Sequence, residues 1–426
     1  MNVRMHRWIL GALAIGGLGA FLACSGSVPD AAPIDEEDAG DAGSEAEANA
    51  CPPSGVSKGP WSLAMTRTGI KIRWEACRAD PKGGIVLRPE SGGADVEAPS
   101  TTSTTTIAST YTSLGNASPP DLPGTYTNHE VALKDLTPGT CFRYELLADR
   151  TKGGRFCTAQ PDGGRVHFMA IADTNPALGQ STRRVLEQLI PLKPDFTIHA
   201  GDIQYYDSIL ETWAGWFPVM RPMLEQGALM AAIGNHEHEK DDEFENYTLR
   251  FFGDDTMGGR DAYYEFESGG VHFFALNSEG SIAPESPQGS WLTGRLAQAS
   301  QRSGYRASIV FFHKPLITCG DTGQDDTSRT KYAPIFVQNK VPLVIQGHMH
   351  GYERFELDGI TWLTSGGGGG RLGNTDENVS RAECASRKSA GAFFHAVDIV
   401  IEGKTIEGKT IDDSGALRDS FSITLP

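Results

Sequence analysis

Five short apolar runs between residues 166 and 345 are each followed closely by a residue type that binds metal ions. Runs of this length suit buried strands, and parallel strands of an α/β sheet bring their carboxyl ends to one edge. One Asp or His after a strand is usually a turn or hydrogen-bonded residue, but five in succession predict a shared site. The residues are Asp173, Asp202 with Tyr205, Asn235 with His236, His313, and His348 with His350.

The donor atoms of this set are oxygen and nitrogen, without thiolates, which suits zinc, iron or manganese rather than a structural cysteine-bound zinc. The set is too large for one tetrahedral site with an open position, but it fills two sites that share a carboxylate. Asp202 follows Gly201 after a central apolar run, so we predict that it is the shared ligand. Two neighbouring ions are the usual clamp for in-line displacement at phosphorus.

The spacing of these residues resembles the five-block signature of metallophosphoesterases, in the version found in purple acid phosphatases. A tyrosine three residues after the second aspartate marks that version. The resemblance covers roughly residues 60 to 426. The blocks are Asp173-x-Asn175, Gly201-Asp202-x-x-Tyr205, Gly234-Asn235-His236-Glu237, His313, and Gly347-His348-x-His350-x-Tyr352-Glu353-Arg354.

The resemblance implies a ligand set for each of two ions. A hard, anionic phenolate favours a ferric ion at the first site, and zinc, manganese or ferrous iron would occupy the second. Tyr206 is a rival for Tyr205, although the family spacing favours Tyr205. The first set is Asp173, Asp202, Tyr205 and His350, and the second is Asp202, Asn235, His313 and His348.

The resemblance also implies a phosphatase that hydrolyses phosphate monoesters by in-line attack of a metal-bound hydroxide, with Asp202 as a catalytic residue. His236 would contact the phosphate and help to supply a proton to the leaving group, which suits an imidazole with a pKa near neutrality. Asn235 and Asn175 are further candidate substrate contacts. Two alternatives stay open: a phosphodiesterase that uses the same centre, and a surface binding protein whose catalytic domain has decayed.

The sequence departs from the family pattern at two places. Asn175 stands where the first block usually has glycine, and residues 314–324 lack the paired histidines of plant-type members. The proton donor is therefore open, and Lys314, Asp321 or Lys331 are possible substitutes. His238 is a further candidate, but it lies in an acidic stretch where a solvated histidine is the simpler interpretation.

The first 24 residues have the layout of a secretory signal, with Arg4 and Arg7 before an apolar run that ends at Cys24. The end of the run resembles a bacterial lipoprotein box, so either lipidation of Cys24 or ordinary signal cleavage is expected. Residues 25–55 read as an acidic tether, because Ala, Asp, Glu and Gly cannot bury enough apolar surface to fold. We therefore expect export to a bacterial periplasm or cell surface, with membrane contact only through a lipid anchor.

Six cysteines remain after Cys24, and an even number in an exported protein favours disulfides. Cys319 and Cys384 are the only two in the second half of the chain and are predicted to pair, while the other pairings stay open. The net charge of -17 is concentrated partly in residues 25–50, and no Lys/Arg cluster indicates nucleic-acid binding. A small phosphorylated substrate is the expected partner; the sequence does not predict an oligomeric state.

The predicted fold class is a two-domain chain, with an all-β sandwich followed by a four-layer αββα domain. Residues 56–160 alternate polar and apolar side chains and resemble the fibronectin type III-like domain that precedes the catalytic domain in purple acid phosphatases. The Ser/Thr run from Ser100 to Thr106 is either a glycosylated or binding loop or, more simply, a solvated strand edge. Residues 165–426 alternate strands and helices, and Ser181 is predicted to cap the first helix.

Overall fold

The computed structural model describes residues 51–78, 83–107, 124–176, 180–205, 213–238, 248–252 and 258–425. The predicted signal segment, Cys24, most of the acidic tether and Tyr206 lie outside the described residues. In the part that is described, no helix is both long and apolar enough to cross a membrane.

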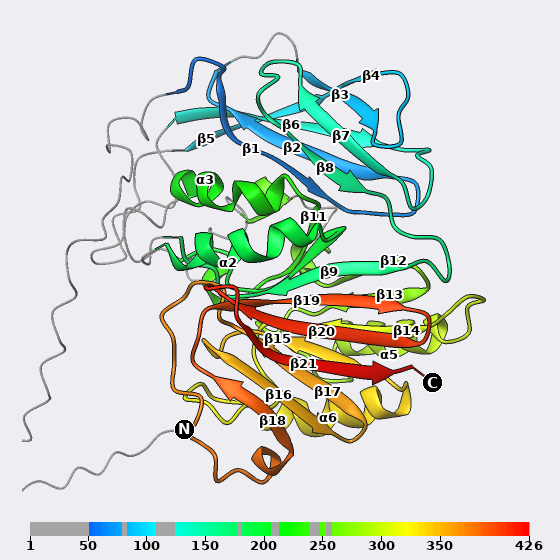
Figure 1. The fold of residues 1–426 in the computed structure, drawn as a ribbon, viewed down its shortest axis with the longest axis vertical. Coiled ribbons are helices and arrows are strands. Elements are labelled where there is room, and N and C mark those ends of the chain that lie inside the picture. The colour runs from blue at the N-terminus through cyan, green and yellow to red at the C-terminus, as the bar shows by residue number, and fades with distance from the viewer. Residues whose placement is uncertain are drawn as a thin grey trace, which may run out of the picture. The chain divides into compact units, whose positions relative to one another are not determined.

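The N-terminal part is β-rich, as predicted (Figure 1). Two layers of four strands enclose a core that contains Trp74, Phe142, Tyr144 and Phe156. One layer has the order β1-β2-β6-β5 and the other β4-β3-β7-β8. The strands are β1 (Val56–Leu63), β2 (Ile70–Ala76), β3 (Gly84–Pro89), β4 (Val96–Pro99), β5 (Thr101–Ile107), β6 (Gly124–Leu133), β7 (Cys141–Leu146) and β8 (Gly153–Cys157).

The α/β part contains two sheets. The parallel strands β9 (Val166–Ile171), β10 (Phe196–Ala200) and β11 (Ala228–Ala232) lie in the larger one, beside the antiparallel strands β19 (His395–Glu402), β20 (Thr405–Asp412) and β21 (Leu417–Thr424). The smaller sheet has the order β12-β13-β14-β15-β17-β16-β18. Its strands are β12 (Tyr264–Ser268), β13 (Val271–Ala275), β14 (Ala307–Phe311), β15 (Leu343–Gln346), β16 (Tyr352–Leu357), β17 (Ile360–Ser365) and β18 (Arg387–Gly391).

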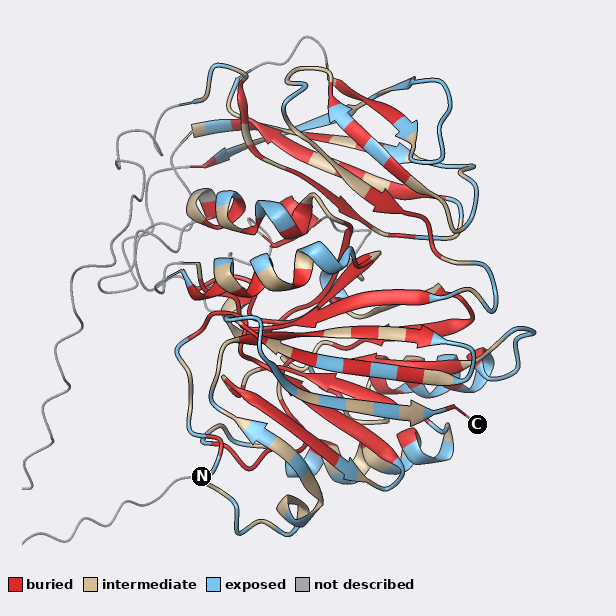
Figure 2. Ribbon diagram, in the orientation of Figure 1, coloured by how far each residue is buried: buried red, intermediate tan, exposed pale blue. Residues whose placement is uncertain are grey.

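The two sheets pack face to face, and each is buried on both faces along its central strands (Figure 2). In β9, Phe168 and Ala170 face the core between the sheets, whereas Met169 and Ile171 face helices α2 (Ser181–Leu189) and α3 (Trp213–Leu224). This alternation follows from the two-residue period of a strand. Helices α5 (Pro287–Ala299) and α6 (Asp326–Gln338) cover the outer face of the smaller sheet. The predicted αββα fold class is confirmed.

The larger sheet continues across the predicted boundary between residues 160 and 165. Strand β1 pairs in parallel with β11, with Ser62 opposite Ala228, so the first layer of the sandwich extends the larger sheet to ten strands. The chain therefore has a continuous sheet where the sequence analysis places two domains. The domain limits themselves stay a prediction.

Ser181 is not the cap of α2, so that prediction is wrong. It is the first helical residue, and the residue before it, Gln180, has a left-handed backbone with φ 63°. The Ser181 hydroxyl instead donates to the carbonyl of Gly369 at 3.4 Å. The apolar face of the helix consists of Val185, Leu186 and Leu189, which are buried.

Three disulfides join the six cysteines: Cys51–Cys77, Cys141–Cys157 and Cys319–Cys384. The predicted pair Cys319–Cys384 is confirmed, and the first two pairs settle the connectivity that the sequence left open. Disulfides persist in oxidising compartments, so they indicate a location outside the cytoplasm. Anchoring at Cys24 stays a prediction.

The Ser/Thr run forms β5, an exposed strand at one edge of the ten-stranded sheet. Its only strand partner in the described structure is β6. The simpler interpretation, a solvated strand edge, therefore describes its place in the fold.

Candidate metal centre

The two sheets bring the predicted ligands together at one edge, because each ligand follows the carboxyl end of a strand. Asp173 follows β9, Asp202 and Tyr205 follow β10, and Asn235 begins the short 3-10 helix η4 (Asn235–Glu237) after β11. The smaller sheet contributes its histidines in the same way: His313 follows β14, and His348 and His350 follow β15.

One group of donor atoms surrounds the hydroxyl of Tyr205. This oxygen lies 3.3 Å from Asp173 Oδ1, 3.4 Å from Asp202 Oδ2 and 2.9 Å from His350 Nε2. Asp173, Asp202 and His350 also form a group whose ligand atoms all lie within 4.8 Å of one another. This group coincides with the first ligand set that the sequence predicts.

A second group of donor atoms surrounds Nε2 of His313. This nitrogen lies 3.1 Å from Asp202 Oδ2, 3.2 Å from Asn235 Oδ1 and 3.1 Å from His348 Nδ1. At most one proton can lie on Nε2, so it cannot satisfy three acceptors at once. Convergent lone pairs of this kind suit a cation, and the residues therefore fit a metal ion. Asp202 belongs to both groups, as predicted for a shared carboxylate.

The backbone at three of these residues is left-handed. Asp173, Asp202 and His348 have φ of 60°, 51° and 68°, values that non-glycine residues rarely adopt. Backbone strain of this kind concentrates at functional sites, where the surrounding structure holds it in place. Gly234 shows how close the packing is, because a Cβ there would lie 2.2 Å from Asp202 Oδ1.

Outer hydrogen bonds orient two of the imidazoles. Nδ1 of His313 lies 2.9 Å from the carbonyl of Ala200, and Nδ1 of His350 lies 2.7 Å from the carbonyl of Arg371. Each bond leaves Nε2 directed at the carboxylates. Such outer partners fix the tautomer and the ring orientation of metal-binding histidines.

The electrostatics of the site favour positive charge. Burial lowers the pKa of His313, but the carboxylates of Asp202 and Asp173 outweigh it and raise that pKa to about 10. Burial also opposes ionisation of Asp202, yet His313 and His236 hold the pKa of Asp202 below its usual range. Burial, together with Asp173 and Asp202, raises the pKa of Tyr205. A phenolate at Tyr205 therefore requires a compensating cation.

Glu237 has a structural role that the sequence does not predict, because the charge of a glutamate favours an exposed position. It is fully buried, and its carboxylate accepts hydrogen bonds from the backbone N–H groups of Gly234 at 2.7 Å, Ile203 at 2.8 Å and Asp202 at 3.1 Å. Burial and the neighbouring Asp202 raise the pKa of Glu237 to about 7. A glutamate three residues after Gly234, in the third position of a helix start, is the signal that could have identified it.

The predicted substrate contacts lie around the two groups. The ring of His236 packs against Tyr205 with centroids 4.1 Å apart, and its Nε2 lies 3.8 Å from Asp202 Oδ2. Asn175 is buried two residues after Asp173. His238 is exposed, in agreement with the simpler interpretation of a solvated histidine, and partial desolvation lowers its pKa. The substrate roles of these residues stay predictions.

The three candidate substitutes for the missing histidines have different surroundings. Lys331 lies 3.7 Å from the carboxylate of Glu285, whereas Asp321 accepts a hydrogen bond from the backbone of Asn374. Lys314 follows His313 directly, and its Nζ lies 2.6 Å from the carboxylate of Glu279. Of the three, Lys314 is thus adjacent to a predicted ligand. His199 and His272 lie within β10 and β13 and are buried.

The profile of the family described as calcineurin-like phosphoesterase matches residues 166–352, which include every predicted ligand. Purple acid phosphatase 22 of Arabidopsis thaliana is 26% identical over 296 residues, which are 65% of this chain and 66% of that protein. A purple acid phosphatase of Glycine max is 25% identical over 66% of this chain and 60% of its own length. These matches show that the chain is similar to calcineurin-like phosphoesterases and to purple acid phosphatases. The matches span about two thirds or less of these relatives.

The fold of the chain also resembles that of a solved structure. The purple acid phosphatase from seeds of yellow lupin (Lupinus luteus) superposes with a TM-score of 0.69 over 86% of this chain and 74% of that chain, at 18% sequence identity. Because the superposition covers 86% of this chain, it includes the β-rich N-terminal part. At such low identity the likeness shows the fold alone.

Replacing Glu237 by Ala should destabilise the protein and impair both metal groups, because the backbone N–H groups of the Asp202 loop lose their buried acceptor. We expect a loss of about 3 kcal/mol or more in the free energy of unfolding. Urea denaturation and metal content by elemental analysis measure the two effects. Glu187→Ala, on the exposed face of α2, is the matched control. Wild-type stability and metal content in Glu237→Ala would contradict the positioning role.

Proposed function

We propose that this protein hydrolyses phosphate monoesters at a dinuclear metal centre. One observation carries the proposal: the Asp202 carboxylate belongs to two adjacent donor groups. One group contains the Tyr205 hydroxyl, and the other contains a nitrogen of each of His313 and His348 and the amide oxygen of Asn235. The relatives named purple acid phosphatases support the monoester as substrate. The complete donor set gives no support to a decayed binding protein.

Each of the two donor groups would hold one metal ion. When bound, such a pair of ions lowers the pKa of water, neutralises phosphate oxygens and stabilises the leaving oxygen. The anionic oxygen of Tyr205 favours a ferric ion in the first set, and a zinc, manganese or ferrous ion suits the second. The first set is Asp173, Asp202, Tyr205 and His350, and the second is Asp202, Asn235, His313 and His348.

The remaining polar side chains would handle the phosphate and the proton. His236 is held against Tyr205 but is 19% exposed, so its imidazole can contact a substrate at the centre. In the protonated form it would contribute a positive charge to a phosphate oxygen and a proton to the leaving oxygen. Asn235 would combine its amide oxygen in the second group with an N–H donor for the phosphate.

Purified protein should release phosphate from an aryl phosphate monoester faster than it cleaves the matching aryl diester. A strong chelator should abolish both activities, because it removes the metal ions that activate water. The measurement is the rate of aryl alcohol release from the two esters, before and after chelation. Full activity after verified metal removal would exclude the dinuclear mechanism, and a faster diester reaction would favour the phosphodiesterase alternative.

The shared position of Asp202 predicts a difference between two aspartate variants. Asp202→Asn should weaken both metal sites, whereas Asp173→Asn should mainly empty the first site, because Asp173 belongs to one group only. Elemental analysis of the purified variants gives the metal content per chain. Equal losses of both metals in the two variants would count against Asp202 as the bridge.

A ferric ion on the phenolate of Tyr205 should give a visible charge-transfer absorption band. Tyr205→Phe should lose this band while keeping the ring that packs against His236. Tyr264→Phe is the control, since it removes a buried hydroxyl that donates to the carbonyl of Ala231 outside the centre. A band that survives in Tyr205→Phe, or that the control also loses, would refute the ligand assignment.

A further inference from the structure

The hydroxyl groups of β5 divide between the two faces of the ten-stranded sheet. Successive side chains of a strand point in opposite directions, so Thr101, Ser103 and Thr105 share one face and lie about 6.6–6.8 Å apart along it. Thr104 and Thr106 lie on the other face. The residues of β5 are exposed for most of its length, because it is an edge strand.

The neighbouring strands extend this face with polar side chains. In the pairing register, Thr101 stands opposite Glu130 and Ser103 opposite Asn128, while Glu130 also stands opposite Arg73 of β2. The face therefore presents a row of hydroxyls, then an amide and a carboxylate, then a guanidinium. The Asn128 side chain donates to Thr105 Oγ1 at 3.3 Å, but its own Oδ1 is buried without a hydrogen-bond partner among the described residues.

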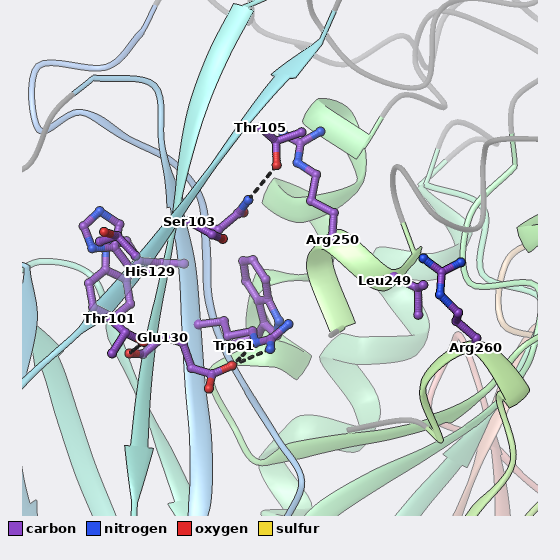
Figure 3. A pocket seen from close by; sticks show the side chains of 13 residues that line it. Trp61, Thr101, Ser103, Thr105, His129, Glu130, Leu249, Arg250 and Arg260 are labelled. Carbon is purple, nitrogen blue, oxygen red and sulfur yellow. Dashed lines mark hydrogen bonds and ion pairs between the residues drawn. The ribbon is translucent and has the colours of Figure 1, made fainter. Parts of the chain in front are cut away.

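A short helix closes the other side of this surface. In α4 (Leu249–Phe252), the Arg250 guanidinium donates to Glu75 of β2 at 2.9 Å, and the carbonyl of Phe251 accepts from the Trp61 indole at 3.0 Å. Between the helix and the strands lies a cavity of about 480 Å³ (Figure 3). This volume is within the roughly 300–1,000 Å³ of small-molecule sites.

The residues that line the cavity come from β1, β2, β5, β6, α4 and the 3-10 helix η6 (Gly259–Asp261). Figure 3 shows Ser103 and Thr105 on the strand side and Leu249 and Arg260 on the helix side. The strands contribute Arg73, Thr101, Ser103, Thr105, Asn128 and Glu130 to the lining.

The lining chemistry favours a neutral, hydroxyl-rich ligand. Arg73 pairs with Glu130 at 2.7 Å, and Arg250 pairs with Glu75, so two of the three guanidinium groups of the lining face carboxylates. The third, Arg260, lies on the helix side, away from Thr101 and Ser103 (Figure 3). Hydroxyl groups can both donate and accept hydrogen bonds. Beside them on the same face, an amide oxygen can accept hydrogen bonds and a guanidinium can donate them. A ligand whose groups both donate and accept, at short regular spacing, matches this surface.

We propose that the cavity between β5 and α4 binds a neutral saccharide, with the hydroxyls of Thr101, Ser103 and Thr105 as contacts. The site is separate from the metal centre in its residues and does not depend on the proposed phosphatase activity. Its effect would be to hold the enzyme on a carbohydrate surface.

Affinity electrophoresis of the full protein in native gels that contain a neutral polysaccharide tests the proposal. The probes are dextran, soluble starch and galactomannan. The wild-type protein should be retarded by at least one of them. Thr101→Val/Thr105→Val should bind that polysaccharide about tenfold more weakly, because two neutral hydrogen bonds are lost while the β-branched shape is kept. Its rate of aryl phosphate hydrolysis should be unchanged.

The matched control is Thr104→Val/Thr106→Val, which removes two hydroxyls of the same strand on the opposite face, and it should be retarded as the wild type is. Ser103→Ala gives a second, milder variant should the double variant fold poorly. The proposal is overturned by a wild-type protein that no probe retards, by cavity-face variants that are retarded normally, or by a control that loses retardation equally.

Discussion

The carboxylate of Asp202 is the constraint on which the rest of the site depends. Its Oδ2 lies 3.1 Å from His313 Nε2 and 3.4 Å from the Tyr205 hydroxyl, so the two donor groups meet at one oxygen. Burying this negative charge is costly unless cations and hydrogen bonds compensate it. The surrounding histidines, the backbone N–H of His236 and the proposed ions all act in that direction.

The fold supplies the geometry that this carboxylate needs. Two buried sheets, packed between helices, hold the strand ends, and the buried Glu237 ties the backbone after β10 to the turn after β11 through hydrogen bonds to Ile203 and Gly234. Left-handed backbones at Asp173 and His348 turn their side chains toward the same place. These backbone conformations are unfavourable in free energy, and the packing of the surrounding core holds them in place, as is usual at functional sites.

The fold class and the clustering of the candidate ligands could be predicted from the sequence, because buried strands are apolar runs and residue types that bind metal ions follow them directly. The buried role of Glu237 could not, since charge alone assigns it to the surface. Ser181 was predicted to cap α2, yet a tertiary bond to Gly369 uses its hydroxyl. The cavity beside β5 was also not predictable, because Leu249 and Arg250 reach it from a distant part of the chain.

Anomalous diffraction from crystals of the metal-loaded protein tests the central claim most directly, since it locates each ion and identifies its element. The account predicts two anomalous peaks on either side of the Asp202 carboxylate, one beside Tyr205 and His350 and one beside His313 and His348. A single peak, or two peaks of which only one lies next to Asp202, would contradict it.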